Sequence, residues 1–151
     1  MADTLFEGYN KLFFSVKDAE SGNMISEAEL ALNPLMHMVD KKHASPAENP
    51  NPVSSEEGYF EGAVVFIMPS NPDEGWFLDV DMSIAGAETS ASLEIPWVKS
   101  LDEPRMIKVL SDVDGTVYFV SCLEPAEPEV GINPCEFTIH YKQSMMSFPA
   151  A

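Results

Sequence analysis

Two thioethers and two imidazoles lie close together at the end of an apolar run. They belong to Met36, His37, Met38 and His43. Soft thioether sulfur favours Cu(I), and imidazole binds copper in either oxidation state, so this set of donors is typical of a copper site. The residue types and their spacing make these four residues the candidate metal ligands of the chain.

Strand geometry divides the four candidates. In a regular strand Met36 and Met38 share one face, and His37 points to the other. The two methionines could then act together, with His43 reaching them from the following loop. A bulge at Pro34 is the alternative, because it would re-aim the side chains.

A simpler interpretation needs no metal. Methionine commonly fills cores, so both methionines would pack inside the fold while His37 and His43 lie exposed. Lys41 and Lys42 also place positive charge beside the histidines, where it would repel a cation. The sequence leaves both interpretations open.

Calcium is the second metal to consider. Asp79 and Asp81 share a face of a predicted strand, and Asp112 and Asp114 lie in a predicted turn. Such oxygen ligands suit Ca²⁺, but an EF-hand needs Gly at the sixth position of its loop, and counting from Asp112 puts Val117 there. We expect these carboxylates to be solvated surface charges.

No catalytic motif is assembled in the sequence. The chain has no Gly-x-Ser-x-Gly elbow, no His-Glu-x-x-His motif and no phosphate-binding glycine loop. Cys122 lies in an apolar run and is expected to be buried rather than reactive. His140 alternates with apolar neighbours and has no evident partner. We therefore predict that the protein is not an enzyme.

Composition limits the class of protein and its partners. A chain of 151 residues is one domain by its length and can bury a real core. Its formal net charge of −17 argues against nucleic acid and anionic membranes as partners. No apolar run is long enough to span a membrane, and the first residues lack the features of a signal peptide. The chain is thus cytoplasmic, or a mature segment whose leader and anchor were removed.

Alternating and β-branched runs predict strands throughout the chain. Trp76, Leu78, Val80 and Met82 alternate with acidic residues, which is typical of a half-buried strand. Residues 44–57 are rich in Pro, Asn, Ser and Glu and are expected to form an exposed loop. Short strands joined by Pro- and Gly-rich turns predict an all-β fold, an antiparallel β-sandwich of seven to eight strands. The expected strands are 12–16, 28–32, 63–68, 76–82, 89–97, 106–110, 116–120 and 137–141.

The C-terminal part of the chain has two interpretations. Residues 1–125 are expected to form the sandwich, and 126–151 a linker and a closing strand. Alternatively, 126–151 contain the first strand of a truncated second repeat, because Gly8–Val16 and Gly131–Ile139 share a Gly, an Asn, a Phe and a final β-branched residue. The spacing of Cys122 and Cys135 would permit one disulfide.

Four segments between Gly8 and Met82 resemble the YtkA-like and FixH-like domains of bacterial envelopes. They are Val16-Lys17-Asp18, Pro34-Leu35-Met36-His37-Met38, Gly58-Tyr59-Phe60-Glu61-Gly62, and Met68-Pro69 followed by Gly75-Trp76-Phe77-Leu78-Asp79-Val80. The resemblance implies an immunoglobulin-like β-sandwich in the periplasm or at the cell surface. It further implies a module that is often anchored to the membrane and is associated with copper handling or oxidase assembly.

These observations lead to two functional hypotheses. The first is a non-enzymatic extracytoplasmic module that binds copper through Met36, Met38 and His43, with His37 as a fourth ligand. The second is a structural or cell-adhesion module that binds no metal and contacts another protein or another copy of itself. Under both hypotheses a protein partner or self-association is expected, with neither nucleic acid nor direct membrane insertion.

Overall fold

The fold is built from antiparallel strands. A computed structural model describes residues 4–53, 58–100, 107–124 and 129–151. No helix in these ranges is long and apolar enough to cross a membrane. The strands in the described residues are β1 (Gly8–Ser15), β2 (Ala28–His37), β3 (Lys42–Ala44), β4 (Ala47–Pro52), β5 (Tyr59–Phe66), β6 (Gly75–Ile84), β7 (Ala87–Glu94), β8 (Ile107–Ser111), β9 (Val117–Glu124) and β10 (Glu136–Tyr141).

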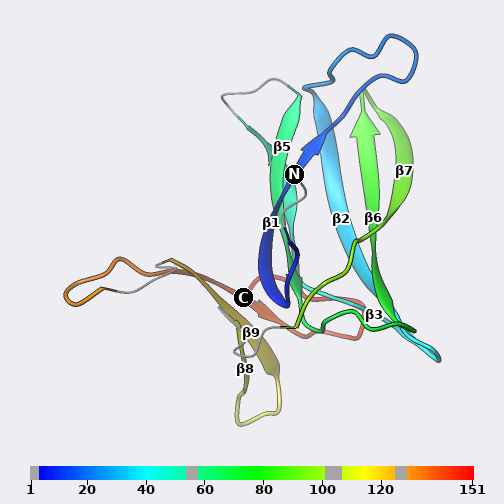
Figure 1. Ribbon diagram of the computed structural model, residues 1–151. Coiled ribbons are helices and arrows are strands. Elements are labelled where there is room, and N and C mark those ends of the chain that lie inside the picture. The colour runs from blue at the N-terminus through cyan, green and yellow to red at the C-terminus, as the bar shows by residue number, and fades with distance from the viewer. Residues whose placement is uncertain (1–3, 54–57, 101–106, 125–128) are drawn as a thin grey trace.

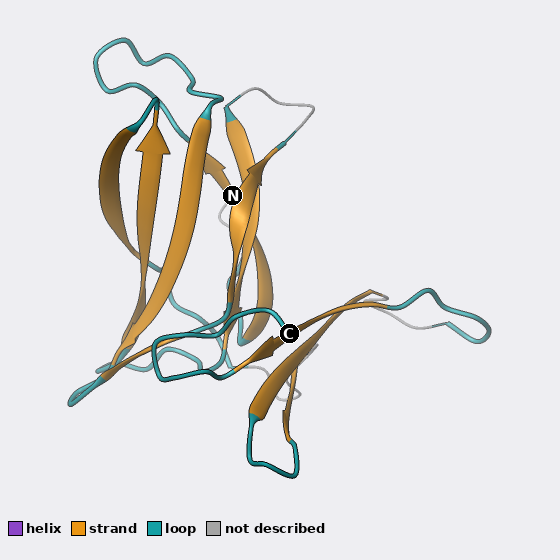
Figure 2. Cartoon of the chain, turned by 180° about the vertical axis from the view of Figure 1, so that it is seen from behind, coloured by secondary structure: helices purple, strands orange, loops and turns teal. Residues whose placement is uncertain are grey.

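Two of the three sheets form a sandwich. One sheet has the strand order β1-β5-β4 and the other the order β3-β2-β6-β7. They stand side by side in Figures 1 and 2, with β1 and β5 in one layer and β2, β6 and β7 in the other. The prediction of an all-β antiparallel sandwich is confirmed.

Alternation along β6 and the apolar run of β5 produce the core. Trp76 and Leu78 are buried on the inner face of β6, whereas Asp79 is partly buried and Asp81 exposed on its outer face. Phe60 and Phe66 of β5 are likewise buried, so the two layers meet through large apolar side chains. Removal of this apolar surface from water is the main favourable contribution to the fold.

The expectation of an exposed loop over 44–57 is wrong for its first part. β4 lies within it as an edge strand of the first sheet, where proline is tolerated because one side of the strand needs no ladder hydrogen bonds. Asn49 also joins the layers, because its side-chain oxygen accepts a hydrogen bond of 2.9 Å from the backbone N–H of Leu32. Residues 54–57 lie outside the described residues.

The third sheet has the order β10-β9-β8 and projects from one end of the sandwich (Figure 1). The predicted last strand, β10, therefore pairs with β9, with Ile139 opposite Val120. No disulfide joins Cys122 of β9, which is partly buried, to Cys135, which is exposed before β10. The division of the chain at residue 125 stays a prediction.

The residues after β10 connect this sheet to the sandwich. The backbone N–H of Ala44 donates a hydrogen bond of 2.9 Å to the carbonyl of Met145. The ring of Phe148 lies edge-on to that of Phe119 in β9, with centroids 5.5 Å apart. The C-terminal segment, residues 142–151, thus lies between β3 and the third sheet.

The two tryptophans provide a test of the core. Trp76 is 0% exposed and Trp97 is 54% exposed. Trp76→Ala should lower the free energy of unfolding by about 3–5 kcal/mol, because it removes a large buried ring and leaves a cavity. Trp97→Ala should change it by no more than about 0.5 kcal/mol. Urea unfolding of both variants measures the difference, and equal losses would contradict the assigned core.

Candidate metal centre

A tight turn brings His43 back beside β2. The backbone N–H of Met38 donates to the carbonyl of Lys41 at 2.9 Å, which reverses the chain after β2. β3 then pairs antiparallel with β2 and places His43 directly opposite Met36. Because directly paired residues share a face of the sheet, His43 points toward the core with Met36. It is 5% exposed, so the expectation of an exposed His43 is wrong.

The buried imidazole of His43 has a different neighbour at each nitrogen. Nδ1 lies 2.9 Å from the carbonyl oxygen of Ala44, and Nε2 lies 3.3 Å from Sδ of Met68. A carbonyl oxygen only accepts hydrogen bonds, so in a ring that carries a single proton that proton lies on Nδ1. Nε2 of this tautomer presents its lone pair toward the thioether.

Trp76 contacts both His43 and Met68 and holds the two residues in place. Its ring lies edge-on to the imidazole of His43, with centroids 5.6 Å apart and an angle of 85° between the planes. Its indole Nε1–H donates a hydrogen bond of 2.9 Å to the carbonyl oxygen of Met68. The indole therefore fixes the backbone of Met68 and bounds one side of the imidazole.

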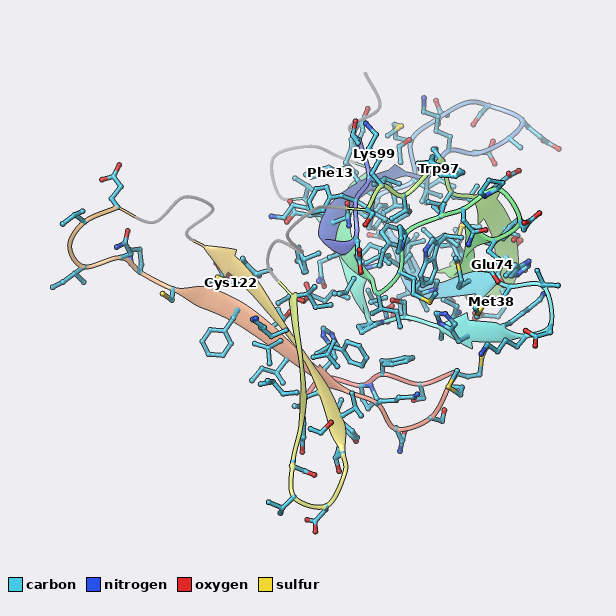
Figure 3. All side chains as sticks on the ribbon, turned by 60° about the horizontal axis from the view of Figure 1, so that its bottom comes forward. Phe13, Met38, Glu74, Trp97, Lys99 and Cys122 are labelled. Atoms are coloured by element: carbon cyan, nitrogen blue, oxygen red, sulfur yellow. The ribbon has the colours of Figure 1, made fainter. Side chains whose placement is uncertain are left out.

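A cavity of about 280 Å³ opens beside this pair. Three thioethers line it, since Met38 and Met145 join Met68. Figure 3 shows Met38 on the side of the sandwich toward the C-terminal segment. Lys41 and Lys142 also line the cavity and no carboxylate does, while the rest of its wall is apolar and consists of Ile67, Phe119 and Phe148.

His37 lies apart from this cavity. Its ring stacks on Phe77, with centroids 4.2 Å apart, and lines a separate hollow with Asn71 and Glu74. Burial lowers the pKa of His37, and the charge of Lys42 lowers it further, against a smaller opposing effect of Asp79. The alternation of β2 explains this separation, because successive side chains point to opposite faces.

The structure thus brings together part of the predicted ligand set. Met38 and His43 line one cavity, Met36 is packed in the core next to His43, and His37 is on the opposite face. Sequence reasoning missed Met68 and Met145. Met68 ends the apolar run before Pro69 and was available as a soft donor, whereas Met145 had no local signal.

Three of the four carboxylates considered for calcium, those of Asp79, Asp81 and Asp112, accept hydrogen bonds from neighbouring groups. Asp79 accepts from Ser92, and Asp81 accepts from Asn33. Asp112 accepts from the backbone N–H groups of Asp114 and Thr116 and from the hydroxyl of Tyr118 in β9, and the hydrogen bond from Thr116 is the main cause of its lowered pKa. Among the described residues no group of three or more His, Cys, Asp or Glu is placed to hold a metal ion.

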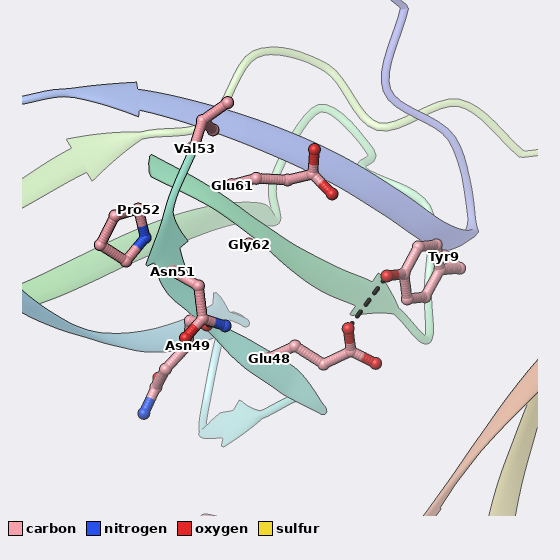
Figure 4. A pocket seen from close by; sticks show the side chains of 8 residues that line it. All are labelled: Tyr9, Glu48, Asn49, Asn51, Pro52, Val53, Glu61 and Gly62. Carbon is pink, nitrogen blue, oxygen red and sulfur yellow. Dashed lines mark hydrogen bonds between the residues drawn. The ribbon is translucent and has the colours of Figure 1, made fainter. Parts of the chain in front are cut away.

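A polar groove of about 360 Å³ lies over β4 and β5 (Figure 4). The hydroxyl of Tyr9 donates a hydrogen bond of 3.0 Å to Glu48, and Glu61 is paired with Lys11 at 2.8 Å. Burial and the neighbouring Glu48 raise the pKa of Tyr9 well above its usual range. Its phenol is therefore neutral, so this groove offers neither a phenolate nor an unpaired carboxylate as a base.

Comparison with protein-family models, curated proteins and solved structures finds no match to this chain. The resemblance to the YtkA-like and FixH-like domains therefore stays a prediction.

The third histidine, His140, is buried where the third sheet faces the sandwich. It is 3% exposed, and no hydrogen-bond partner for its Nδ1 is present among the described residues. Ser121 and Thr138 pair across β9 and β10, and each has a buried hydroxyl that also has no hydrogen-bond partner among the described residues. Burial lowers the pKa of His140, and Glu48 opposes this effect.

This buried imidazole makes stability depend on pH. Because the pKa of His140 is lower in the folded state, the unfolded chain binds more protons below about pH 6.5, and stability falls with falling pH. Urea unfolding at pH 7.5 and 5.5 should show a smaller loss for His140→Gln than for the parent chain. The same loss in both would show that His140 contributes nothing to the pH dependence.

Proposed function

We propose that this protein is a non-enzymatic Cu(I)-binding β-sandwich module. The ligands are Nε2 of His43 and the thioether sulfur of Met68, with Met38 and Met145 completing the set. The observation that carries the proposal is the 3.3 Å approach of Nε2 to Sδ inside a largely apolar cavity. The proposal keeps Met38 and His43 from the sequence-based ligand set and replaces Met36 and His37.

The state of the imidazole supports a metal ligand. With Nδ1–H donated to the carbonyl of Ala44, Nε2 is an acceptor, and the thioether of Met68 is an acceptor too. In this tautomer no proton lies between the two atoms. Two lone pairs that face each other at this distance suit a shared cation. A metal-ligating His commonly donates its other ring N–H to a backbone carbonyl in this way.

The remaining lining selects a soft ion of low charge. Thioethers favour Cu(I), and hard cations need oxygen ligands that the lining does not supply. Lys41 and Lys142 disfavour any cation, and they disfavour a divalent ion more than a monovalent one because the repulsion scales with charge. Burial of the imidazole against Trp76 further keeps water from the site.

The C-terminal segment controls access to the proposed site. Met145 is 44% exposed, and its carbonyl is tied to the N–H of Ala44, the residue after His43. An ion would enter where this segment covers β3, and Met145 would close over it. Copper handling by such a module is consistent with the periplasm or the cell surface, which the sequence resemblance implies.

A second candidate function is a structural or adhesion module that contacts another protein. The observation that favours it is the exposed apolar surface of the third sheet, where Leu110 is 53% and Phe137 is 58% exposed. Large exposed apolar patches mark interaction sites. This surface lies on a different part of the fold from the cavity, so both functions are compatible.

A Cu(I) competition titration against a chromophoric chelator tests the metal proposal, with protein that carries no His tag. The parent chain should bind one Cu(I). Met68→Leu should weaken binding by about tenfold or more, since it keeps the size of the side chain and removes the sulfur. His43→Gln should weaken it at least as much.

Two matched controls separate ligand loss from general damage. Met36→Leu alters a core methionine next to His43, and His37→Gln alters the imidazole on the opposite face; both should keep the affinity of the parent chain. Binding no tighter than that of a single-imidazole control would contradict the proposal. So would a loss of affinity in His37→Gln that exceeds the loss in His43→Gln.

A further inference from the structure

Two distant segments of the chain share one local geometry. Gly8 and Gly131 both have positive φ, at 119° and 134°, and each stands two residues before an asparagine. In the first segment, Oδ1 of Asn10 accepts from the N–H of Phe6 at 3.1 Å. Its Nδ2 donates to the carbonyls of Phe6 and Gly8 at 2.7 and 2.8 Å.

The second segment repeats each of these hydrogen bonds. Oδ1 of Asn133 accepts from the N–H of Glu129 at 3.0 Å, and Nδ2 donates to the carbonyls of Glu129 and Gly131 at 2.8 and 3.3 Å. The partners stand four and two residues before the asparagine in both segments. The match therefore extends from residue types to three hydrogen bonds and an unusual backbone angle.

The chain also returns in the same way after each strand. After β1, the N–H of Asp18 donates to the carbonyl of Asn23, and the N–H of Ile25 donates to the carbonyl of Val16, each at 2.9 Å. A longer loop follows β10 but ends in the same pairing. There the N–H of Tyr141 donates to the carbonyl of Pro149 at 3.0 Å, and the N–H of Ala151 donates to the carbonyl of Ile139 at 2.9 Å.

The two strands differ in what covers their equivalent faces. Leu12, Phe14 and Val16 pack against the core of the sandwich. The side chains at the equivalent positions are Cys135, Phe137 and Ile139, of which Cys135 is exposed and Phe137 is 58% exposed. The face that packs against the core on β1 is therefore exposed on β10 at Cys135 and Phe137, while Ile139 is partly buried like Val16.

The same face of the third sheet carries partly exposed apolar and aromatic side chains, together with Lys108, which pairs with Val120. Cross-strand pairing places Ile139 beside Val120, and Tyr141 beside Tyr118 and then Leu110. The rings of Tyr118 and Tyr141 lie 6.5 Å apart, and Leu110 is 53% exposed. A sheet with one apolar face is stable when another layer covers that face.

We propose that β10 is the first strand of a second sandwich and that the exposed face of the third sheet docks a sheet equivalent to β2 and β6. The apolar and aromatic residues of this face are Leu110, Tyr118, Val120, Phe137, Ile139 and Tyr141. The covering sheet follows the repeated segment in the same polypeptide, as β2 and β6 follow β1. A whole second copy of this chain is a poor occupant, because its own four-stranded sheet is already covered by β5. The net charge of −17 would also oppose its approach.

A tandem chain tests this proposal. Residues 26–100 are appended after Ala151, because Ala151 is equivalent to Ile25, and Cys122 is replaced by Ser so that Cys135 is the one thiol. In the 151-residue chain with the same replacement, Cys135 should react with iodoacetamide at the rate of an exposed thiol. In the tandem chain the reaction should slow by about tenfold or more, since the equivalent Leu12 packs on the core.

A matched control excludes shielding by an unfolded extension. A tandem chain in which the appended copy of Trp76 is replaced by Ser should restore the fast reaction of Cys135. Equal rates in the tandem and the 151-residue chains would overturn the proposal, and so would protection that persists in this control.

Phe137→Ser gives an independent measurement. It should leave the urea midpoint of the 151-residue chain unchanged because the ring is exposed there, and it should lower the stability of the added unit in the tandem chain. An equal effect on the two chains would contradict the assigned docking face.

Discussion

Burial of one indole fixes the geometry on which the proposed site depends. Trp76 is wholly buried, so its N–H needs a partner inside the protein, and the carbonyl of Met68 supplies it. That hydrogen bond ties the segment after β5 to β6. The ring of Phe66 in β5 also packs against the indole, with ring centroids 5.2 Å apart, so Trp76 joins the two layers. The thioether of Met68 reaches His43 because its backbone is held there.

The register of β2 with β3 is the second constraint. It places His43 opposite Met36 and on the inner face. A slip by one residue would turn His43 outward and bring Lys42 toward the core, because neighbouring side chains of a strand point to opposite faces. The short turn from Met38 to Lys41 sets this register, so a local backbone hydrogen bond determines the direction in which the imidazole points.

Local patterns predicted the fold better than they predicted the site. Alternation identified β6, and the apolar run identified β5, because each pattern lies within one strand. β4 was missed because its prolines and asparagines are typical of loops, while its place in the fold depends on tertiary contacts such as that of Asn49 with Leu32. The same limit applies to the cavity. Met38 and His43 are close in sequence, but Met68 and Met145 join them only through the packing of distant segments.

The repeated asparagine turn shows how structure strengthens a weak sequence signal. A few identities between Gly8–Val16 and Gly131–Ile139 carry little weight by themselves. Equivalent hydrogen bonds at Asn10 and Asn133 show that the identities maintain one backbone geometry. If the third sheet belongs to a second sandwich, as proposed, the apolar residues on its exposed face have a function. The C-terminal segment that reaches back to β3 is then the loop that follows the repeated strand.

The protonation of His43 is the central claim of the copper proposal. Long-range ¹H–¹⁵N correlation spectra of the imidazole rings at neutral pH measure it directly, before and after addition of Cu(I), which is diamagnetic. The account predicts that His43 carries its proton on Nδ1 in both spectra and that Cu(I) shifts its Nε2 resonance. A proton on Nε2 of His43 in the metal-free protein, or a Cu(I)-induced shift at His37 with His43 unchanged, would contradict it.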